Sequence, residues 1–210
     1  MSHGAVFPNL PRRAAWIAGT MAAAVGGMTA VAPREPTEPD RRWSEAMAAG
    51  HSERLESAAH ALDRSGRGAA RGLTIAGLAL LAARRRRLEG LAAFGLAEAV
   101  TPAAVNLIKL WADRHRPPTA QLQARGSSFP SGHAAYAAAT LTAVALLPSR
   151  RLDAPGRQAL WVGVVAGSAS MAWSRTYLQV HWLSDVAAGT LLGAAVTLAT
   201  FDAVDHVRDR

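Results

Sequence analysis

Apolar segments alternate with short arginine-rich stretches along most of this chain, and the alternation limits the folds that it can adopt. The apolar segments cover residues 14–32, 68–83, 88–110, 134–147, 159–173 and 183–201. A helix needs roughly 20 apolar residues to cross a bilayer core, so some segments have the full length and others are short. Their many Ala and Gly residues allow helices to pack closely, in a membrane or in a soluble core. The pattern predicts an all-α fold.

The first apolar segment, residues 14–32, has two interpretations. It follows Arg12 and Arg13 and is just long enough for a transmembrane helix. A basic start, an apolar run and the sequence Ala-Val-Ala at 30–32 are also typical of a cleaved signal peptide. We favour a retained helix, and either interpretation places the next residues outside the cytoplasm.

The arginines between the apolar segments predict the orientation in a membrane. Arg84–Arg87 form one run, and Arg150, Arg151 and Arg157 form a second basic group. Short basic loops face the cytoplasm according to the positive-inside rule. The predicted fold is therefore a membrane-embedded helical bundle with six transmembrane helices in the cell membrane. This topology places residues 1–13, 84–87 and 202–210 inside, and residues 111–133 and 174–181 outside.

Residues 33–67 form a polar segment after the first apolar one. Pro33, Pro36 and Pro39 are typical of a linker. Beyond them, apolar residues recur at roughly helical spacing: Trp43, Met47, Leu55, Ala58 and Leu62. We expect an extracytoplasmic amphipathic helix, or a pair of helices, that lies on the membrane surface or caps the bundle. An ordinary solvated helix fits the pattern equally well.

The chain carries a formal net charge of +8 and contains no cysteine. The lack of cysteine excludes disulfides, thiol chemistry and cysteine-based metal sites. The positive charge suits an anionic partner such as nucleic acid, anionic lipid or a phosphorylated substrate. Because the arginines are divided among loops on both sides of the predicted bundle, we expect no nucleic-acid partner. Lys109 is the single lysine among 23 basic residues, which indicates a specific role for it.

Three cations in or next to the predicted outer segments are suited to holding a phosphate group. Lys109 and Arg116 are separated by six residues, and Arg175 lies in the second outer segment. Arginine offers planar bidentate donors and lysine a point charge. Ser131 and Gly132 precede a predicted helix, whose backbone N–H groups and dipole would add donors for an anion. Each feature alone is common, as an interfacial cation or a helix cap, but together they predict an anion site.

Two histidines in the same outer segments are suited to nucleophilic or acid–base chemistry. His181 and Asp185 are four residues apart, a spacing that places both on one helical face. Asp185 can accept the Nδ1 proton of His181 and leave Nε2 free as a nucleophile or a base. His133 supplies a second imidazole, which can protonate a leaving alkoxide.

These residues form three motifs in order: K-x6-R-P from Lys109, P-S-G-H ending at His133, and S-R-x5-H-x3-D ending at Asp185. The set resembles the signature of the type 2 phosphatidic acid phosphatase (PAP2) superfamily, which includes membrane lipid phosphatases, soluble class A acid phosphatases and vanadium haloperoxidases. The resemblance does not extend to residues 1–66. It implies an all-α bundle and hydrolysis without a metal or other cofactor, through a phosphohistidine intermediate.

The resemblance also implies a role for each residue. His181 would be the nucleophile, Asp185 its orienting partner and His133 the acid that protonates the leaving oxygen. The phosphate oxygens would be held by Lys109, Arg116, Ser131, Gly132 and Arg175.

We expect residues 68–201 to form the phosphatase core. Its substrate is expected to be a phospholipid or an isoprenoid phosphate, hydrolysed at the extracytoplasmic face. An exported soluble acid phosphatase is one alternative. A membrane protein that binds phosphate headgroups without turnover is another. The short chain argues against a haloperoxidase.

Other polar and aromatic residues carry more general predictions. Arg114, His115 and Arg125 in the first outer loop are expected to be solvated, with electrostatic or headgroup contacts as the alternative. Glu98 lies inside an apolar segment, where an acid is a functional candidate or faces a polar neighbour in the bundle. Three tryptophans flank the predicted outer helix ends, as an aromatic belt would, with packing in a soluble core as the alternative: Trp111, Trp173 and Trp182.

Overall fold

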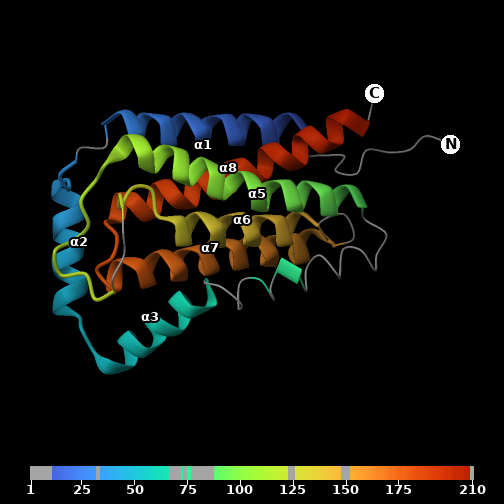
Figure 1. Ribbon diagram of the computed structural model, residues 1–210. Helices are drawn as coiled ribbons and strands as arrows, with labels where there is room; N and C mark the ends of the chain where they lie inside the picture. Colours follow the sequence, from blue (N-terminus) through green and yellow to red (C-terminus); the bar gives the residue numbers. More distant parts are fainter. Residues whose placement is uncertain are drawn as a thin grey trace.

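The computed structural model describes residues 11–31, 34–66, 72, 75–76, 88–122, 126–147 and 152–208. These residues form seven α-helices and no strand, which confirms the predicted all-α fold. Five of the helices run along the length of the bundle (Figure 1): α1 (Pro11–Val31), α5 (Leu88–Ala112), α6 (Gly132–Leu146), α7 (Ala154–Tyr177) and α8 (Leu183–Arg208). The other two, α2 (Glu38–Ala49) and α3 (Glu53–Ser65), lie at one end of it.

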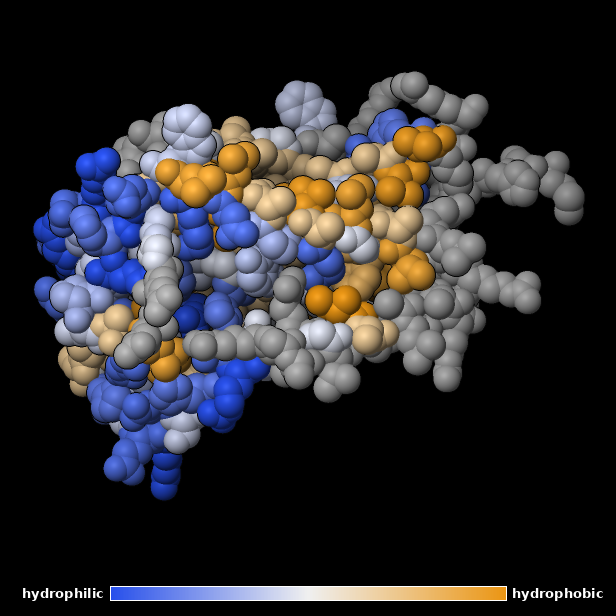
Figure 2. All heavy atoms as spheres, in the orientation of Figure 1, coloured by the Kyte–Doolittle hydropathy of each residue, from blue (hydrophilic) through white to orange (hydrophobic). Residues whose placement is uncertain are grey.

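Two of the described helices are long and apolar enough to cross a bilayer, over Gly90–Ala112 and Leu183–Val207. Trp16–Met28 and Gly132–Leu146 are apolar but shorter. Most of residues 68–83 and all of the arginine run lie outside the described residues, so six spans stay a prediction. On the face shown in Figure 2, hydrophobic residues extend along the bundle, and hydrophilic residues gather at the end where α2 and α3 lie.

α7 is longer than the apolar segment that predicted it. Its last turn contains residues 174–177, which belong to the predicted outer segment beyond the apolar one. Ser174 and Arg175 in this turn are polar but buried, because α3 supplies partners for both. Arg175 is therefore fixed on a helix and not carried by a loop.

α6 and α8 pack with almost no space between their backbones. A Cβ atom on Gly189 of α8 would lie 2.3 Å from the carbonyl oxygen of Ser131. A Cβ atom on Gly193 would lie 2.0 Å from the carbonyl oxygen of Ala135. This close approach lets the Ser131 N–H donate to the Asp185 carbonyl oxygen at 2.9 Å. The start of α6 is thereby fixed against the start of α8, which brings two of the three motifs together.

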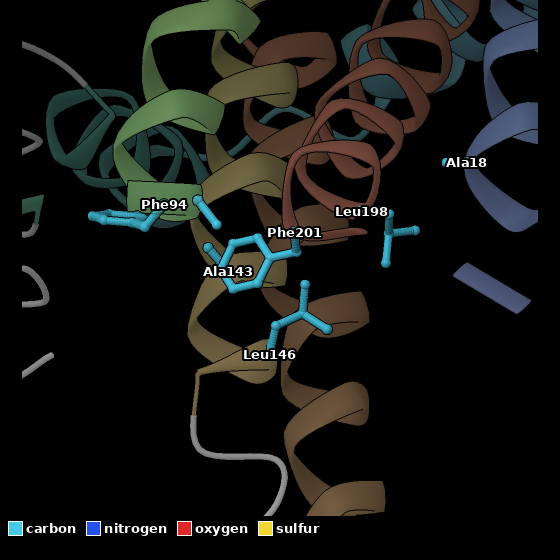
Figure 3. Packing of buried hydrophobic residues seen from close by; sticks show 7 residues of the cluster. Ala18, Phe94, Ala143, Leu146, Leu198 and Phe201 are labelled. Atoms are coloured by element: carbon cyan, nitrogen blue, oxygen red, sulfur yellow. The ribbon is translucent and has the colours of Figure 1, made fainter. Parts of the chain in front are cut away.

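A hydrophobic cluster holds the helices together at the opposite end of the bundle. Its buried members come from α1, α5, α6 and α8 (Figure 3): Ala18, Ala93, Phe94, Ala143, Leu146, Leu198 and Phe201. Burial of apolar surface stabilises such a cluster by roughly 25 cal/mol per Å². One end of the bundle is thus held by apolar packing, and the other end carries the polar residues.

α2 and α3 confirm the predicted pair of helices within residues 33–67, and they cap the bundle by contacts with α7 and α8. Thr37 starts α2 with a capping box, in which the Thr37 N–H donates to the Asp40 carboxylate at 3.0 Å. The buried residues of the two helices are Asp40, Ala59 and Asp63. A buried acid is costly unless it is paired. Asp40 and Asp63 are both paired, with predicted site residues or with residues next to them in the sequence or in space.

Candidate active site

The predicted site residues lie at the end of the bundle that α2 and α3 cover (Figure 1). They come from the ends of four helices: Lys109 from the last turn of α5, Arg116 from the loop after it, Ser131, Gly132 and His133 from the start of α6, Arg175 from the last turn of α7, and His181 and Asp185 from the start of α8. The ends of α5 and α7 meet the beginnings of α6 and α8 here. Segments far apart in the sequence therefore contribute to one site.

His181 and Asp185 form a pair, although not on one helical face as predicted. His181 precedes α8, which begins at Leu183. Asp185 lies in the first turn and reaches back, so its Oδ2 accepts the Trp182 N–H at 2.9 Å and lies 3.5 Å from His181 Nδ1. An acid at this position of a helix commonly contacts the residues just before the helix. The spacing of four residues still brings the two side chains together.

The imidazole of His181 is buried and faces a cation. The pKa of His181 is lowered to about 4, chiefly by burial; Asp185 raises it, and Arg116 and Arg175 lower it. The ring is therefore neutral at neutral pH. Its Nε2 lies 3.4 Å from Arg116 Nη1, which makes Nε2 the unprotonated nitrogen and assigns the proton to Nδ1. A neutral imidazole with an unprotonated Nε2 has the form that a nucleophile requires.

Two of the predicted cations converge on one backbone carbonyl. The Lys109 ammonium donates to the Ser127 carbonyl oxygen at 2.5 Å, and Arg116 Nη2 donates to the same oxygen at 3.3 Å. Arg116 Nη1 also donates to the Val180 carbonyl oxygen at 2.7 Å, next to His181. Burial lowers the pKa of Arg116 and Asp185 raises it, but a guanidinium keeps its charge at any physiological pH. Positive charge is thus held close to the Nε2 atom of His181.

Ser131 precedes α6 without acting as an ordinary cap. Its side chain makes no capping hydrogen bond, and its buried hydroxyl has no hydrogen-bond partner among the described residues. The first N–H groups of a helix also lack partners within the helix and favour an anion. The hydroxyl and the start of α6 are thus available as donors, and phosphate binding by Ser131 and Gly132 stays a prediction.

Arg114 corrects the prediction that it is solvated, because only 2% of its surface is exposed. Its Nη1 donates to Asp185 Oδ1 at 2.8 Å, and its Nη2 donates to Asp40 Oδ2 at 2.7 Å. Its position in the sequence gave no sign of this burial, because one of its two acidic partners comes from α2. Arg114 thus binds the carboxylate that lies 3.5 Å from His181 Nδ1.

Asp40 connects α2 to this network. Its Oδ1 accepts the Ser184 N–H at 2.8 Å, directly before Asp185. Burial on its own raises the pKa of Asp40, but hydrogen bonds from Ser184, Thr37 and Arg114 outweigh it and leave the pKa below its usual value. Asp40 is therefore ionised. A continuous chain of polar contacts runs from Asp40 through Arg114 and Asp185 to His181.

A second acid that the sequence analysis did not single out, Asp63, lies beside His133 and Arg175. Its Oδ1 accepts a hydrogen bond from Arg175 Nη1 and lies 3.5 Å from His133 Nε2. Asp63 and Arg175 are both buried. In the sequence, the one indication that Asp63 is buried is its place next to Leu62, which belongs to the predicted apolar face. The structure thus brings His133 and Arg175 together through a residue from α3.

The remaining predictions have mixed outcomes. The side chain of His115 is exposed, as predicted, and Arg125 lies outside the described residues. Trp111 is exposed, as expected of a belt residue, whereas Trp182 is buried and donates from Nε1 to the His115 carbonyl oxygen at 2.8 Å. Trp182 therefore belongs to the site wall and not to an exposed aromatic belt.

The contacts of Glu98 and Trp173 bear on the alternatives that were left open for them. Glu98 faces a polar neighbour, since Thr140 of α6 donates to its carboxylate at 2.6 Å. Trp173 packs against Tyr177, with ring centroids 5.0 Å apart. No group of three His, Asp or Glu side chains within the described residues is placed to hold a metal ion.

The sequence model of the PAP2 superfamily matches residues 90–209. This chain belongs to the PAP2 superfamily. The match contains all three motifs, and it begins after α2 and α3. The Asp40 and Asp63 carboxylates at the site therefore come from outside the part of this PAP2 protein that the family model describes.

Two bacterial lipid phosphatases are similar in sequence. Decaprenylphosphoryl-5-phosphoribose phosphatase of Mycobacterium tuberculosis is 39% identical over 143 residues, which are 66% of this chain and 73% of that protein. Phosphatidylglycerophosphatase B of Bacillus subtilis is 36% identical over 90 residues, which are 41% of this chain and 44% of that protein. The second alignment thus spans less than half the length of the relative.

Two solved structures have a similar fold. The transmembrane PAP2-type phosphatidylglycerolphosphate phosphatase from Bacillus subtilis superimposes with a TM-score of 0.78 at 19% identity, over 92% of this chain and 96% of that one. LpxE from Aquifex aeolicus superimposes with a TM-score of 0.63 at 19% identity, over 79% of this chain and 96% of that one. The PAP2 fold therefore extends beyond the part that the family model matches.

Proposed function

We propose that this PAP2 protein is an integral membrane phosphatase that removes the terminal phosphate of a lipid phosphate or diphosphate. The observation that carries the proposal is the neutral, buried imidazole of His181, which lies between the Asp185 carboxylate and the Arg116 guanidinium. Such a group is poised to attack phosphorus, and the surrounding cations can neutralise the charge of the phosphate.

The chemistry proceeds in two steps through a phosphohistidine. In the first, His181 Nε2 forms a bond to phosphorus, the bond to the lipid oxygen breaks, and His133 gives its proton to that oxygen. In the second, His133 takes a proton from water, the water oxygen bonds to phosphorus, and the bond to Nε2 breaks. Inorganic phosphate leaves and His181 is restored.

The other predicted site residues bind and orient in this mechanism. Asp185 accepts a hydrogen bond from the Nδ1–H group of His181 and stabilises the charge that develops on the ring. Phosphoryl transfer depends mainly on positioning and on neutralising the equatorial oxygens. Donors for these oxygens come from Lys109, Arg116, Ser131, Gly132 and Arg175.

An apolar cavity supports a lipid as the substrate. It has a volume of about 550 Å³ and lies between α1, α6, α7 and α8. Its walls include Ile17, Ala138, Val165 and Leu191. Because α6, α7 and α8 also carry site residues at one end, a hydrocarbon chain attached to a phosphate in the site can lie along them. The two relatives are named for a glycerolipid phosphate and for a decaprenyl-linked phosphate, and we propose one of these two classes for this protein.

The site is proposed to face the extracytoplasmic side of the cell membrane. The arginine run at 84–87 supports this orientation, because a short basic loop is retained in the cytoplasm. Reporter fusions after residues 86 and 120 test it. The fusion after 86 is expected to be active only with a cytoplasmic reporter, and the fusion after 120 only with an exported one. The reverse pattern contradicts the proposed orientation.

Phosphate release by the detergent-purified protein tests the activity. The panel contains phosphatidate, phosphatidylglycerol phosphate, an isoprenoid diphosphate and an aryl phosphate, each with EDTA present. We expect release from at least one lipid, unaffected by EDTA and abolished in His181→Ala. Binding of the lipids without any release would instead indicate a headgroup-binding protein.

A further inference from the structure

Asp63 contacts two residues of the site from a helix that the family model does not include. We propose that Asp63 is a positioning residue, which orients His133 and keeps it protonated so that it can donate a proton to the leaving oxygen. This inference rests on the proposed function, since it concerns the proton-donating step of that reaction.

One face of α3 is fixed against the site over three successive turns. The Ser174 hydroxyl donates to the Ala59 carbonyl oxygen at 2.8 Å. One turn later Asp63 meets Arg175 and His133. At the end of the helix, a Cβ atom on Gly66 would lie 2.9 Å from His133 Cδ2, so the backbone itself touches the ring. Residues three and four apart share a helical face, so the contacts at Ala59 and Gly66 hold Asp63 against the site.

The charge of Asp63 bears on the protonation of His133. The cations of the site are Arg175 from α7, Arg116 from the loop after α5 and Lys109 from α5. These positive charges disfavour protonation of a nearby imidazole such as that of His133. Among the described residues, Asp63 is an acid within ion-pair distance of His133, and it also offsets the charge of Arg175. The Asp185 carboxylate of α8 is occupied by Arg114 and the Trp182 N–H.

The contact also bears on which nitrogen transfers the proton. Asp63 lies against Nε2 of His133, and the two ring nitrogens are distinct sites. In the proposed role, Asp63 holds the ring at Nε2, and the proton that passes to the leaving oxygen is the one on Nδ1. The carboxylate of a catalytic triad acts on its histidine in the same way.

Asp63→Asn removes the charge and keeps the shape of the side chain. We expect kcat for the lipid phosphate to fall by about tenfold or more, because a general acid contributes at least that much to a poor leaving group. An aryl phosphate needs little protonation, so its kcat should change by less than about threefold. The loss of activity at high pH should begin at a lower pH than in the wild type, and KM should not rise.

Glu53→Gln is the matched control, since Glu53 is an exposed acid on the same helix. His133→Ala and the double variant complete the set, and Asp63→Asn should add no further loss on the lipid phosphate in the His133→Ala background. Asp63→Glu keeps the charge, so its rate should fall while the pH at which activity is lost stays in place. This variant provides the test if Asp63→Asn is not recovered folded.

Three results would overturn this role of Asp63. Equal loss on both substrates with an unchanged pH profile would mean that Asp63 only anchors α3. A raised KM with unchanged kcat would mean that it serves Arg175 alone. Wild-type behaviour of Asp63→Asn would mean that His133 does not depend on it. All three leave the proposed phosphatase function intact, whereas a wild-type protein without turnover overturns both proposals.

Discussion

Two histidine–aspartate pairs lie at the site, and they are built differently. His181 and Asp185 are four residues apart, and their nearest nitrogen and oxygen are separated by 3.5 Å. His133 and Asp63 are also separated by 3.5 Å, but they lie on different helices, α6 and α3. In both pairs the carboxylate also accepts a hydrogen bond from an arginine, Arg114 in the first pair and Arg175 in the second.

The two histidines differ in their exposure to solvent. The side chain of His181 is 4% exposed and that of His133 is 22% exposed. A buried neutral ring is suited to attack phosphorus, because water does not compete with its partners. A ring that solvent reaches is suited to exchange protons in both steps of the reaction. The difference in burial therefore agrees with the proposed division of labour between nucleophile and acid.

Asp185→Asn sharpens this comparison with the largest expected effect. The Asn amide has no charge and one acceptor oxygen where the carboxylate has two, so it no longer fixes the proton on Nδ1 of His181. We expect kcat to fall on the order of a hundredfold or more on lipid and aryl phosphates alike. KM should change little, because the cations are unchanged. Steady-state kinetics on both substrates provide the measurement, and a wild-type rate would contradict the orienting role.

Arg114→Met tests the link between α2 and the first pair. The substitution leaves the Asp40 and Asp185 carboxylates buried without their shared cation. Breaking a buried ion pair in this way costs about 3–5 kcal/mol, so we expect a clearly lower midpoint of thermal unfolding in detergent. Arg42→Met is the matched control, since Arg42 is exposed and pairs only with Glu38 one turn away. Equal unfolding midpoints for the two variants would contradict the role of Arg114.

The pH dependence of stability tests the burial of His181 and has the smallest expected effect. Below pH 6.5 the unfolded chain protonates this histidine, whereas the native state resists protonation until about pH 4. Stability from this group is complete above pH 6.5 and declines as the pH falls toward 4. Relative to His181→Asn, the wild-type unfolding midpoint should fall on the order of a few degrees over this range. A constant difference between the two proteins would contradict a buried neutral ring.

The sequence predicted the parts of the site that depend on local spacing. The motif residues lie at helix ends, and the amphipathic segment forms two helices, as expected. His181 and Asp185 meet because four residues separate them, even though His181 precedes the helix. The apolar segment 159–173 underestimated α7, which continues to Tyr177, where Ser174 and Arg175 are buried against α3.

The contacts between distant segments could not be predicted in this way. Arg114 was expected to be solvated, but it pairs with Asp40 and Asp185, which are both more than 70 residues away in the sequence. Its partner Asp40, like Asp63, lies on an amphipathic helix. The apolar spacing of these helices predicted that other positions face the bundle. Which face of such a helix turns inward depends on the partners that the bundle offers. Here those partners are Arg114 and Arg175, and acids are buried as a result.

Trapping the covalent intermediate tests the central claim most directly. The purified protein is mixed with a lipid carrying a radiolabelled terminal phosphate, with EDTA present. It is then quenched with base within one turnover and mapped by mass spectrometry. We predict a phosphoryl group on His181 that forms and decays at rates consistent with kcat and is absent from His181→Ala. Turnover without a labelled His181, or a label on another residue, would contradict the assignment of the nucleophile.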